Sequence, residues 1–326
     1  MKPADFRMPA EWEPHLATWI AWPHNREDWP GRFTPIPWVY GEIVRKLAAV
    51  ERVRILVQTP TLATQARRIL EKVGANLDAV EFVPRQTDRV WTRDYCPLFV
   101  RNPRGEVALT AWRFNAWARY DNWRQDAAVP GFLAQRLKLP VFTPLMVLEG
   151  GSIDVNGEGI LLTTEECLLS PIQARNPGMD RARIEQHFRE FLGVTRVLWL
   201  RNGISGDDTH GHVDDLARFV NPTTVVLCEA AAPRDRTTLR AAGLNVVKLP
   251  MPRPLLFAGR QLPASYANFY IANGLVLVPT FNDPNDRIAL NTLAKLFSGR
   301  EVTGVNCTEL IWGLGALHCM TQQQPA

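Results

Sequence analysis

Short apolar runs with β-strand character alternate with helical stretches along the chain, and this alternation constrains its fold more than any other feature. We expect strands at 53–57, 80–83, 97–100, 107–112, 159–162, 195–200, 223–228, 244–249 and 274–278. We expect helices at 40–50, 62–73, 126–137, 181–192 and 284–297, of which the last three are the clearest. The pattern predicts an α/β fold. No Pro/Ser linker interrupts it, so we treat residues 1–326 as a single domain.

The residues that we single out below for their chemistry recur at a rough interval. Asp94, Glu149, His212 and Cys319 are separated by 55, 63 and 107 residues, and the last interval is about twice the earlier ones. A period of roughly 50 to 60 residues is typical of repeated units around a shared centre. The spacing therefore predicts five radial α/β units, each bringing the end of a strand to the same axis.

The amino-terminal segment 12–38 is rich in Trp and Pro. Trp rings are too large to leave exposed, and repeated Pro prevents a long helix. We therefore expect an ordered loop held over a pocket or over the core, with most of its rings serving to pack.

Composition narrows the class of protein. Hydrophobic residues make up 46% of the chain and charged residues 21%, as in globular proteins. The formal charge of +4 comes without a dense Lys/Arg run, so we expect no nucleic-acid partner. No apolar stretch suits a signal peptide or a membrane span, and we expect a cytoplasmic protein with no membrane partner. Five scattered Cys without a CxxC pair suggest neither a disulfide framework nor a zinc knuckle.

One of these thiols, Cys319, follows a turn flanked by Gly313 and Gly315 close to the carboxyl end. Buried Cys usually serves as a small apolar filler. An exposed nucleophile is the alternative. His318 is a poor candidate for its base, because neighbours in an extended segment point to opposite faces.

The stretch Asp208-Thr209-His210-Gly211-His212-Val213-Asp214 offers a second set of reactive groups. If it is an extended strand, Asp208, His210, His212 and Asp214 share one face. Two imidazoles and a carboxylate could bind zinc. Alternatively, His212 is a general base beside a carboxylate that binds a cationic substrate. The other histidines offer few further metal ligands, and a purely structural His pair remains open.

Two further carboxylates stand in distinctive local sequences. Asp94 lies in Trp91-Thr92-Arg93-Asp94, where its ordinary role would be an ion pair with Arg93. Glu149 precedes Gly150 and a second glycine, which lets the backbone approach another group closely or simply forms a bulge. Together the chain supplies one thiol, one imidazole and three carboxylates, a set suited to covalent attack on a guanidinium carbon.

The order of motifs resembles the agmatine deiminase and bacterial peptidylarginine deiminase family across essentially the whole chain. The matching motifs are Trp-x-Arg-Asp (91–94), Phe-Asn-Ala-Trp (114–117), Leu-Glu-Gly-Gly (148–151), Gly-His-Val-Asp (211–214), Asn-Phe-Tyr-Ile-Ala-Asn-Gly (268–274) and His-Cys-Met-Thr-Gln-Gln (318–323). The opening Glu-Trp-Glu-Pro-His (11–15) and Trp-Pro (22–23) also look like that family's amino terminus. The resemblance implies a five-bladed α/β propeller, or pentein, in which one guanidine-modifying domain surrounds a central active site.

By this resemblance, Cys319 is the nucleophile and His212 the acid/base. Asp94 and Asp214 grip the guanidinium, and Glu149 orients His212. The resemblance implies no cofactor and no metal. We assign the remaining substrate contacts to Trp91, Trp117, Gly150 and Asn268.

The implied reaction converts agmatine to N-carbamoylputrescine and ammonia through a covalent thiouronium on Cys319. A peptidyl-arginine or other arginine-derivative deiminase is the alternative, because Ala118-Arg119-Tyr120 stands where agmatine-specific members commonly have Gly and Lys. Cys96, and Gly315-Ala316-Leu317 before His318, also depart from the family pattern. Two other functions remain as rivals: a metal-dependent hydrolase built on His210, His212 and Asp214, and a non-catalytic guanidinium-binding protein. The expected partner is a small cationic guanidinium compound, and the chain could form a homodimer.

Overall fold

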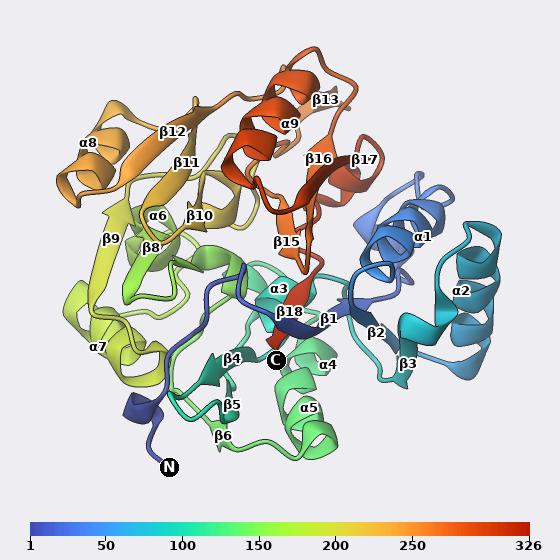
Figure 1. Cartoon of the computed structure of the whole chain (residues 1–326), viewed down its shortest axis with the longest axis horizontal. Coiled ribbons are helices and arrows are strands. Elements are labelled where there is room, and N and C mark those ends of the chain that lie inside the picture. The colour runs from blue at the N-terminus through green and yellow to red at the C-terminus, as the bar shows by residue number, and fades with distance from the viewer.

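Five small mixed sheets stand around one central axis in the computed structural model, which describes residues 1–326 (Figure 1). The strand orders are β18-β1-β2-β3, β4-β5-β6, β7-β8-β9, β10-β11-β12 and β15-β16-β17, and a two-stranded hairpin β13-β14 lies outside these blades. The strands are β1 (His15–Ala21), β2 (Arg52–Val57), β3 (Val80–Pro84), β4 (Leu98–Arg101), β5 (Val107–Thr110), β6 (Val141–Phe142), β7 (Asp154–Val155), β8 (Ile160–Thr164), β9 (Arg196–Leu200), β10 (Ala217–Asn221), β11 (Thr224–Cys228), β12 (Asn245–Leu249), β13 (Leu256–Phe257), β14 (Arg260–Gln261), β15 (Tyr270–Ala272), β16 (Leu275–Thr280), β17 (Glu301–Asn306) and β18 (Gln322–Pro325). The predicted α/β propeller is confirmed.

Every blade repeats one unit, in which an antiparallel strand pair is followed by a parallel pair. A parallel pair needs a crossover, and helices supply it on the outside of the propeller (Figure 1). The helices are α1 (Ile36–Leu47), α2 (Pro60–Lys72), α3 (Thr92–Tyr95), α4 (Arg124–Ala127), α5 (Val129–Leu137), α6 (Glu165–Leu169), α7 (Arg181–Leu192), α8 (Pro233–Ala241) and α9 (Asn285–Leu296). None of them has both the length and the apolar character needed to cross a bilayer.

Local sequence explains where the best-predicted helices begin and end. The Asp180 side chain accepts the backbone N–H of Arg183 and caps the start of α7, and Gly193 ends that helix with a left-handed φ of 65°. Thr59 caps α2 in the same way through the N–H of Leu62. Polar capping residues followed by apolar spacing therefore place these helices close to the predicted bounds.

The last strand of the chain completes the first blade. β18 pairs antiparallel with β1, so that Thr18 lies opposite Gln323, and β1 continues parallel to β2. The prediction of a loop over the whole segment 12–38 was wrong here, because its residues His15–Ala21 form the strand β1. The prediction that its rings pack is largely confirmed, since Trp19, Trp22 and Trp29 are fully buried.

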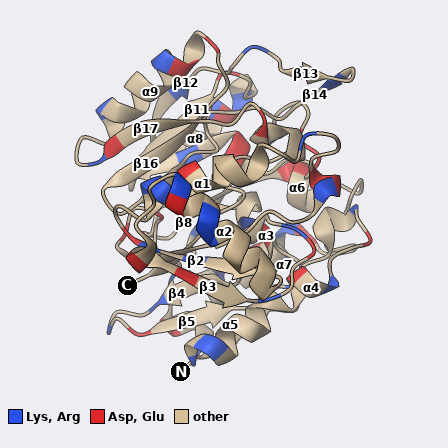
Figure 2. Cartoon of the chain, turned by 90° about the vertical axis from the view of Figure 1, so that its right-hand side faces the viewer, with Lys and Arg blue, Asp and Glu red and all other residues tan.

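The propeller places one short segment of each blade at the axis. Within five residues before the inner strand of each blade stand, in turn, Cys319 (before β18), Asp94 (before β4), Glu149 (before β7), Asp214 (before β10) and Asn268 (before β15). The β13-β14 hairpin projects from the body of the molecule (Figure 2). Lys/Arg and Asp/Glu side chains are intermixed over the face shown there. Residues distant in sequence therefore meet at the centre because the repeat presents the same position five times.

Candidate active site

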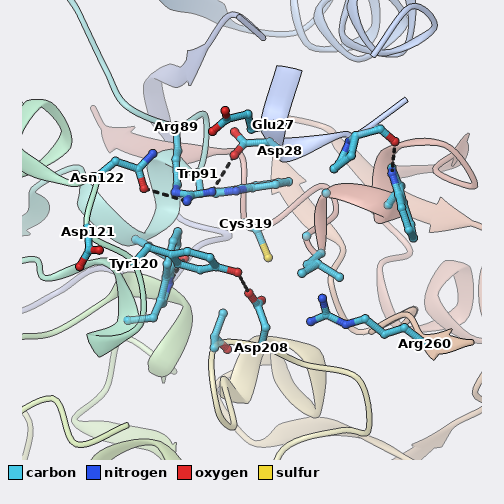
Figure 3. Close-up of a pocket in the computed structure, with 18 residues that line it drawn as sticks. Glu27, Asp28, Arg89, Trp91, Tyr120, Asp121, Asn122, Asp208, Arg260 and Cys319 are labelled. Carbon is cyan, nitrogen blue, oxygen red and sulfur yellow. Dashed lines mark hydrogen bonds and ion pairs between the residues drawn. The ribbon is translucent and has the colours of Figure 1, made fainter. Parts of the chain in front are cut away.

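A cavity of about 560 Å³ leads from the surface to this centre (Figure 3). Cys319 and Asp94 lie at its inner end, together with the rings of Trp91 and Trp117. Toward the surface it is lined by charged and polar side chains, among them Glu27, Asp28, Arg89, Tyr120, Asp121, Asn122, Asp208 and Arg260. The mouth carries four carboxylates against two guanidinium groups, which favours a cationic ligand.

Cys319 occupies a turn directly before β18, not an extended segment. Its carbonyl accepts the N–H of Arg93 at 3.1 Å, which ties the turn to α3. Asn268 Nδ2 donates to the thiol Sγ at 3.1 Å, and Asp214 Oδ2 lies 3.9 Å from the same sulfur. Burial and the charges of Asp214, Asp215 and Asp94 raise the pKa of the thiol well above its usual range. The thiolate therefore needs a cation beside it.

Asp94 is held by two donors on opposite sides. The N–H of Gly151 donates to Oδ1 at 3.1 Å, and the indole Nε1 of Trp117 donates to Oδ2 at 3.0 Å. Trp117 sits between Ala116 and Ala118 in a run of three residues with left-handed φ of 50 to 59°. Such φ values cost non-glycine residues on the order of 1 kcal/mol or more each, so the turn that aims the indole at Asp94 is strained.

The Asp94 carboxyl is buried beside other acids, and this changes its protonation. Burial, followed by the charges of Asp214 and Glu149, raises its pKa to about 7, although His212 opposes the shift. A guanidinium bound here would place a positive charge beside Asp94 and favour its ionised form.

The imidazole of His212 is sandwiched between two acids. Nδ1 lies 3.8 Å from Asp94 Oδ1, and Nε2 lies 3.7 Å from Glu149 Oε2. Neither nitrogen has a hydrogen-bond partner. Burial lowers the pKa of His212, but Asp94, Cys167 and Glu149 outweigh it and raise the pKa well above the usual range. The two neighbouring acids therefore favour the imidazolium form of the ring.

Glu149 is anchored from behind by a residue that the sequence did not point to. Arg175 Nε donates to Glu149 Oε1 at 3.0 Å, and both side chains are fully buried. Burial alone would raise the pKa of Glu149, but Arg175 and His212 lower it to about 2. Arg175 reaches this position from a loop between α6 and α7 that lacks any motif. The second oxygen, Oε2, is left free to face His212.

Gly151 explains how these groups come so close together. A Cβ at this position would lie 2.6 Å from His212 Nδ1, 2.9 Å from Asp94 Oδ1 and 3.0 Å from Asp214 Oδ2. The predicted close approach of the backbone after Glu149 is therefore present at both glycines. Gly151 approaches the three reactive side chains, and Gly150 approaches the backbone carbonyl of Arg93, with which a Cβ would collide.

The stretch from Asp208 to Asp214 is not the extended strand that we expected. It forms a tight turn that ends in a 3-10 helix, Val213–Asp215, because Asp207 Oδ2 accepts the N–H groups of Gly211 and His212 at 2.9 and 3.0 Å. The turn sends alternate side chains to different neighbours. Asp208 bonds Tyr120, and His210 Nε2 lies 3.1 Å from Ser170 Oγ. The predicted zinc face of His210, His212 and Asp214 was therefore wrong.

Two other clusters have metal-like spacing: Glu149 with Cys167 and His212, and Asp214 with Asp215 and Cys319. Each already has a competing protein donor. Arg175 pairs with Glu149, while Asn268 Nδ2 donates to both Asp215 and Cys319. The predicted substrate contact Asn268 thus touches the thiol itself. Of the predicted substrate contacts, Trp91, Asp94 and Trp117 line the cavity, whereas Gly150, Asp214 and Asn268 do not, and the lining also excludes His212 and Glu149.

Comparisons with known proteins cover the chain almost completely. The model of the family described as Porphyromonas-type peptidyl-arginine deiminase matches residues 7–325. The agmatine deiminase of Pseudomonas fluorescens (strain SBW25) is 37% identical over 362 residues, which is 98% of this chain and 96% of the relative.

Two solved structures share the fold closely. The agmatine deiminase of Enterococcus faecalis, described as catalysing its reaction, has a TM-score of 0.90 and 32% identity over 99% of this chain and 97% of its own. A cysteine-to-serine variant of the C. jejuni agmatine deiminase with substrate bound has a TM-score of 0.89 and 29% identity over 98% and 96% of the two chains.

Proposed function

Because the chain belongs to the Porphyromonas-type peptidyl-arginine deiminase family, we propose that it is a hydrolase that converts agmatine to N-carbamoylputrescine and ammonia. One observation carries the proposal: the Cys319 thiol lies at the inner end of an acidic cavity, close to Asp94, Asp214 and the imidazole of His212. The relatives named agmatine deiminase, at more than 30% identity over nearly the whole chain, support the same reaction.

In the first half of the reaction, Asp94 and Asp214 hold the planar guanidinium through charge-assisted hydrogen bonds. When the substrate binds, its positive charge stabilises the Cys319 thiolate, and the thiol releases its proton to solvent. The thiolate then attacks the guanidinium carbon. A C–S bond forms and a tetrahedral intermediate results. His212, as the imidazolium, gives its proton to the departing nitrogen, the C–N bond breaks, and ammonia leaves a thiouronium on Cys319.

In the second half, the neutral His212 takes a proton from water, and the resulting hydroxide adds to the thiouronium carbon. The hydroxyl group then loses its proton to solvent as the C=O bond forms and the C–S bond breaks, which restores the thiolate and releases the carbamoyl product. Glu149, fixed by Arg175, keeps the His212 ring oriented through both halves and favours its charged form. No step requires a group from outside the chain other than substrate and water.

The charge of the outer cavity supports agmatine as the substrate. Agmatine carries a second cation, an ammonium, at the end of its carbon chain, whereas arginine carries a carboxylate there as well. Of the two basic residues at the mouth, Arg89 is already paired with Asp28 at 2.6 Å. Arg119 does not line the cavity, and its Nε lies 3.8 Å from Asp208. Arg260, on the projecting hairpin, is the single lining guanidinium without an ion pair, and it is the feature that would favour an arginine-type carboxylate.

The test is ammonia release from agmatine, free arginine and an arginine-containing peptide. We expect turnover with agmatine to exceed turnover with the other two. Cys319→Ala should abolish release while leaving the far-ultraviolet circular dichroism unchanged. Turnover retained by Cys319→Ala, or inhibition by a chelator with indifference to thiol alkylation, would overturn the mechanism.

A further inference from the structure

Glu11, near the start of the chain, is a buried carboxyl with four polar contacts, and the reaction above does not use it. Its Oε1 accepts Arg218 Nη2 at 2.9 Å and the backbone N–H of Ile271 at 2.8 Å. Its Oε2 pairs with Arg93 Nη2 at 3.2 Å and with His318 Nε2 at 2.8 Å. Burial would raise the pKa of Glu11, but Arg218, His318 and Arg93 lower it well below its usual range. Glu11 is therefore a carboxylate, and His318 Nε2 must donate to it.

The other nitrogen of the same ring reaches the active centre. His318 Nδ1 lies 2.6 Å from Asp214 Oδ2, and that oxygen lies 3.9 Å from Cys319 Sγ. The second oxygen, Asp214 Oδ1, is buried without a partner. A continuous chain of contacts thus runs from Glu11 through His318 to Asp214 and the thiol.

Three neighbouring carboxyls provide an internal comparison. Burial raises the pKa of Asp94 to about 7 and the pKa of Asp215 well above its usual range. Asp214 is equally buried, yet its pKa is lowered, because the hydrogen bond and the charge of His318 overcome the effect of burial. Of the three, only Asp214 touches His318.

We propose that His318, anchored by Glu11, is a positioning residue that keeps Asp214 ionised and fixed beside the Cys319 thiol, ready to receive a guanidinium. This inference rests on the proposed function. The charged or titratable groups around Asp214 and His318 are Glu11, Arg93, Asp94, Asp154, His212, Asp215, Arg218 and Cys319. With His318 in place, substrate binding requires a proton to leave Asp94 but none to leave Asp214.

Two substitutions separate the two contacts of the ring. In His318→Gln, the side-chain amide can reproduce the Nε2 donor to Glu11 but not the Nδ1 donor to Asp214. In His318→Asn, the amide can reproduce the Nδ1 donor but not the Nε2 donor, and the ring's charge is lost. His187→Gln on α7 is the matched control, since that ring stacks on Phe191 away from the site.

The readout is kcat/KM for agmatine between pH 5 and pH 9. In His318→Gln, Asp214 must now lose a proton as well, so the acid limb should steepen from about one proton to about two. The loss should be at least about tenfold at pH 6, mainly in KM, and should shrink toward pH 9. His318→Asn should lie between His318→Gln and wild type, and His187→Gln should match wild type. An equal loss at every pH, or an unchanged profile, would overturn the proposal.

A second measurement needs neither turnover nor a folded variant. In wild-type protein labelled with ¹³C, the Asp214 carboxyl carbon, assigned through bonds from its own backbone, should report an ionised carboxylate at pH 5, because the contact with His318 lowers its pKa. A protonated Asp214 at that pH would overturn the proposal. If wild type released no ammonia from any guanidine, the proposed function would fall, but this spectrum would still decide the state of Asp214.

Discussion

The replacement Gly151→Ala tests whether the active centre depends on the close approach of one backbone atom. The added methyl carbon would meet His212, Asp94 and Asp214 at 2.6, 2.9 and 3.0 Å, whereas ordinary contacts begin at 3.4 Å. The three side chains must therefore retreat by between about 0.4 and 0.8 Å, into a region that is already filled. They carry the proton donor and both proposed guanidinium contacts, so one methyl group disturbs all three.

A misplacement of about 1 Å can lower a rate by about 100-fold, so we expect kcat/KM for agmatine to fall by about 10- to 100-fold. Overpacking should also cost on the order of 1 to 3 kcal/mol of unfolding free energy. The assays are ammonia release and urea unfolding. Gly131→Ala in α5 is the matched control, because its Cβ would have no neighbour within 4 Å and should leave activity unchanged. Wild-type activity in Gly151→Ala would refute the idea that this glycine sets the geometry.

Three further predictions concern Asp94 and its partners. The pKa of Asp94 is about 7 and only its ionised form grips a guanidinium, so kcat/KM should rise about tenfold per pH unit below pH 7 and level off above it; a flat profile from pH 5 to 7 would contradict this. That pKa is raised in the folded state, so the folded protein holds the proton more tightly and loses stability as pH rises from about 4 to 7. Asp94→Asn should therefore be more stable than wild type at pH 8 by about 2 to 4 kcal/mol and closer to it at pH 4, as measured by urea unfolding at both values. Trp117→Phe removes the indole donor to Asp94 and should raise KM about 5- to 30-fold. Trp123→Phe is the control, because the Trp123 ring lies outside the cavity lining. Equal KM in the two variants would show that the donor is dispensable.

The sequence was most informative where the physical signal is local. Helix α7 matches the predicted range 181–192 because Asp180 caps its start and Gly193 ends it. Helix α8 was missed, since its nine residues bury little more than Leu239 and the polar remainder gives no clear periodicity. Strand β1 was missed because the surrounding Trp and Pro hide the alternation of a strand.

The candidate site shows the same division. Asp94, Glu149, His212, Asp214 and Cys319 could be picked out because each stands in a distinctive short motif, and the structure brings them to one axis. The contacts behind them could not be predicted, although Glu11 itself stands in the motif at 11–15. Glu11 and Arg175 act through contacts to residues 307 and 26 positions away, and such pairings depend on how the blades are arranged. The extended conformation assigned to 208–214 failed for a related reason, since Asp207 folds that stretch into a turn.

The pairing of β18 with β1 also means that the first blade can be completed only late in the synthesis of the chain. A ribosome makes the strands of all the other blades before it makes β18, and the thiol arrives only just ahead of that strand. During synthesis the first blade has an unpaired edge and the centre has carboxylates but no nucleophile. A nascent chain that stalls before Cys319 therefore lacks both the nucleophile and the strand that completes the first blade.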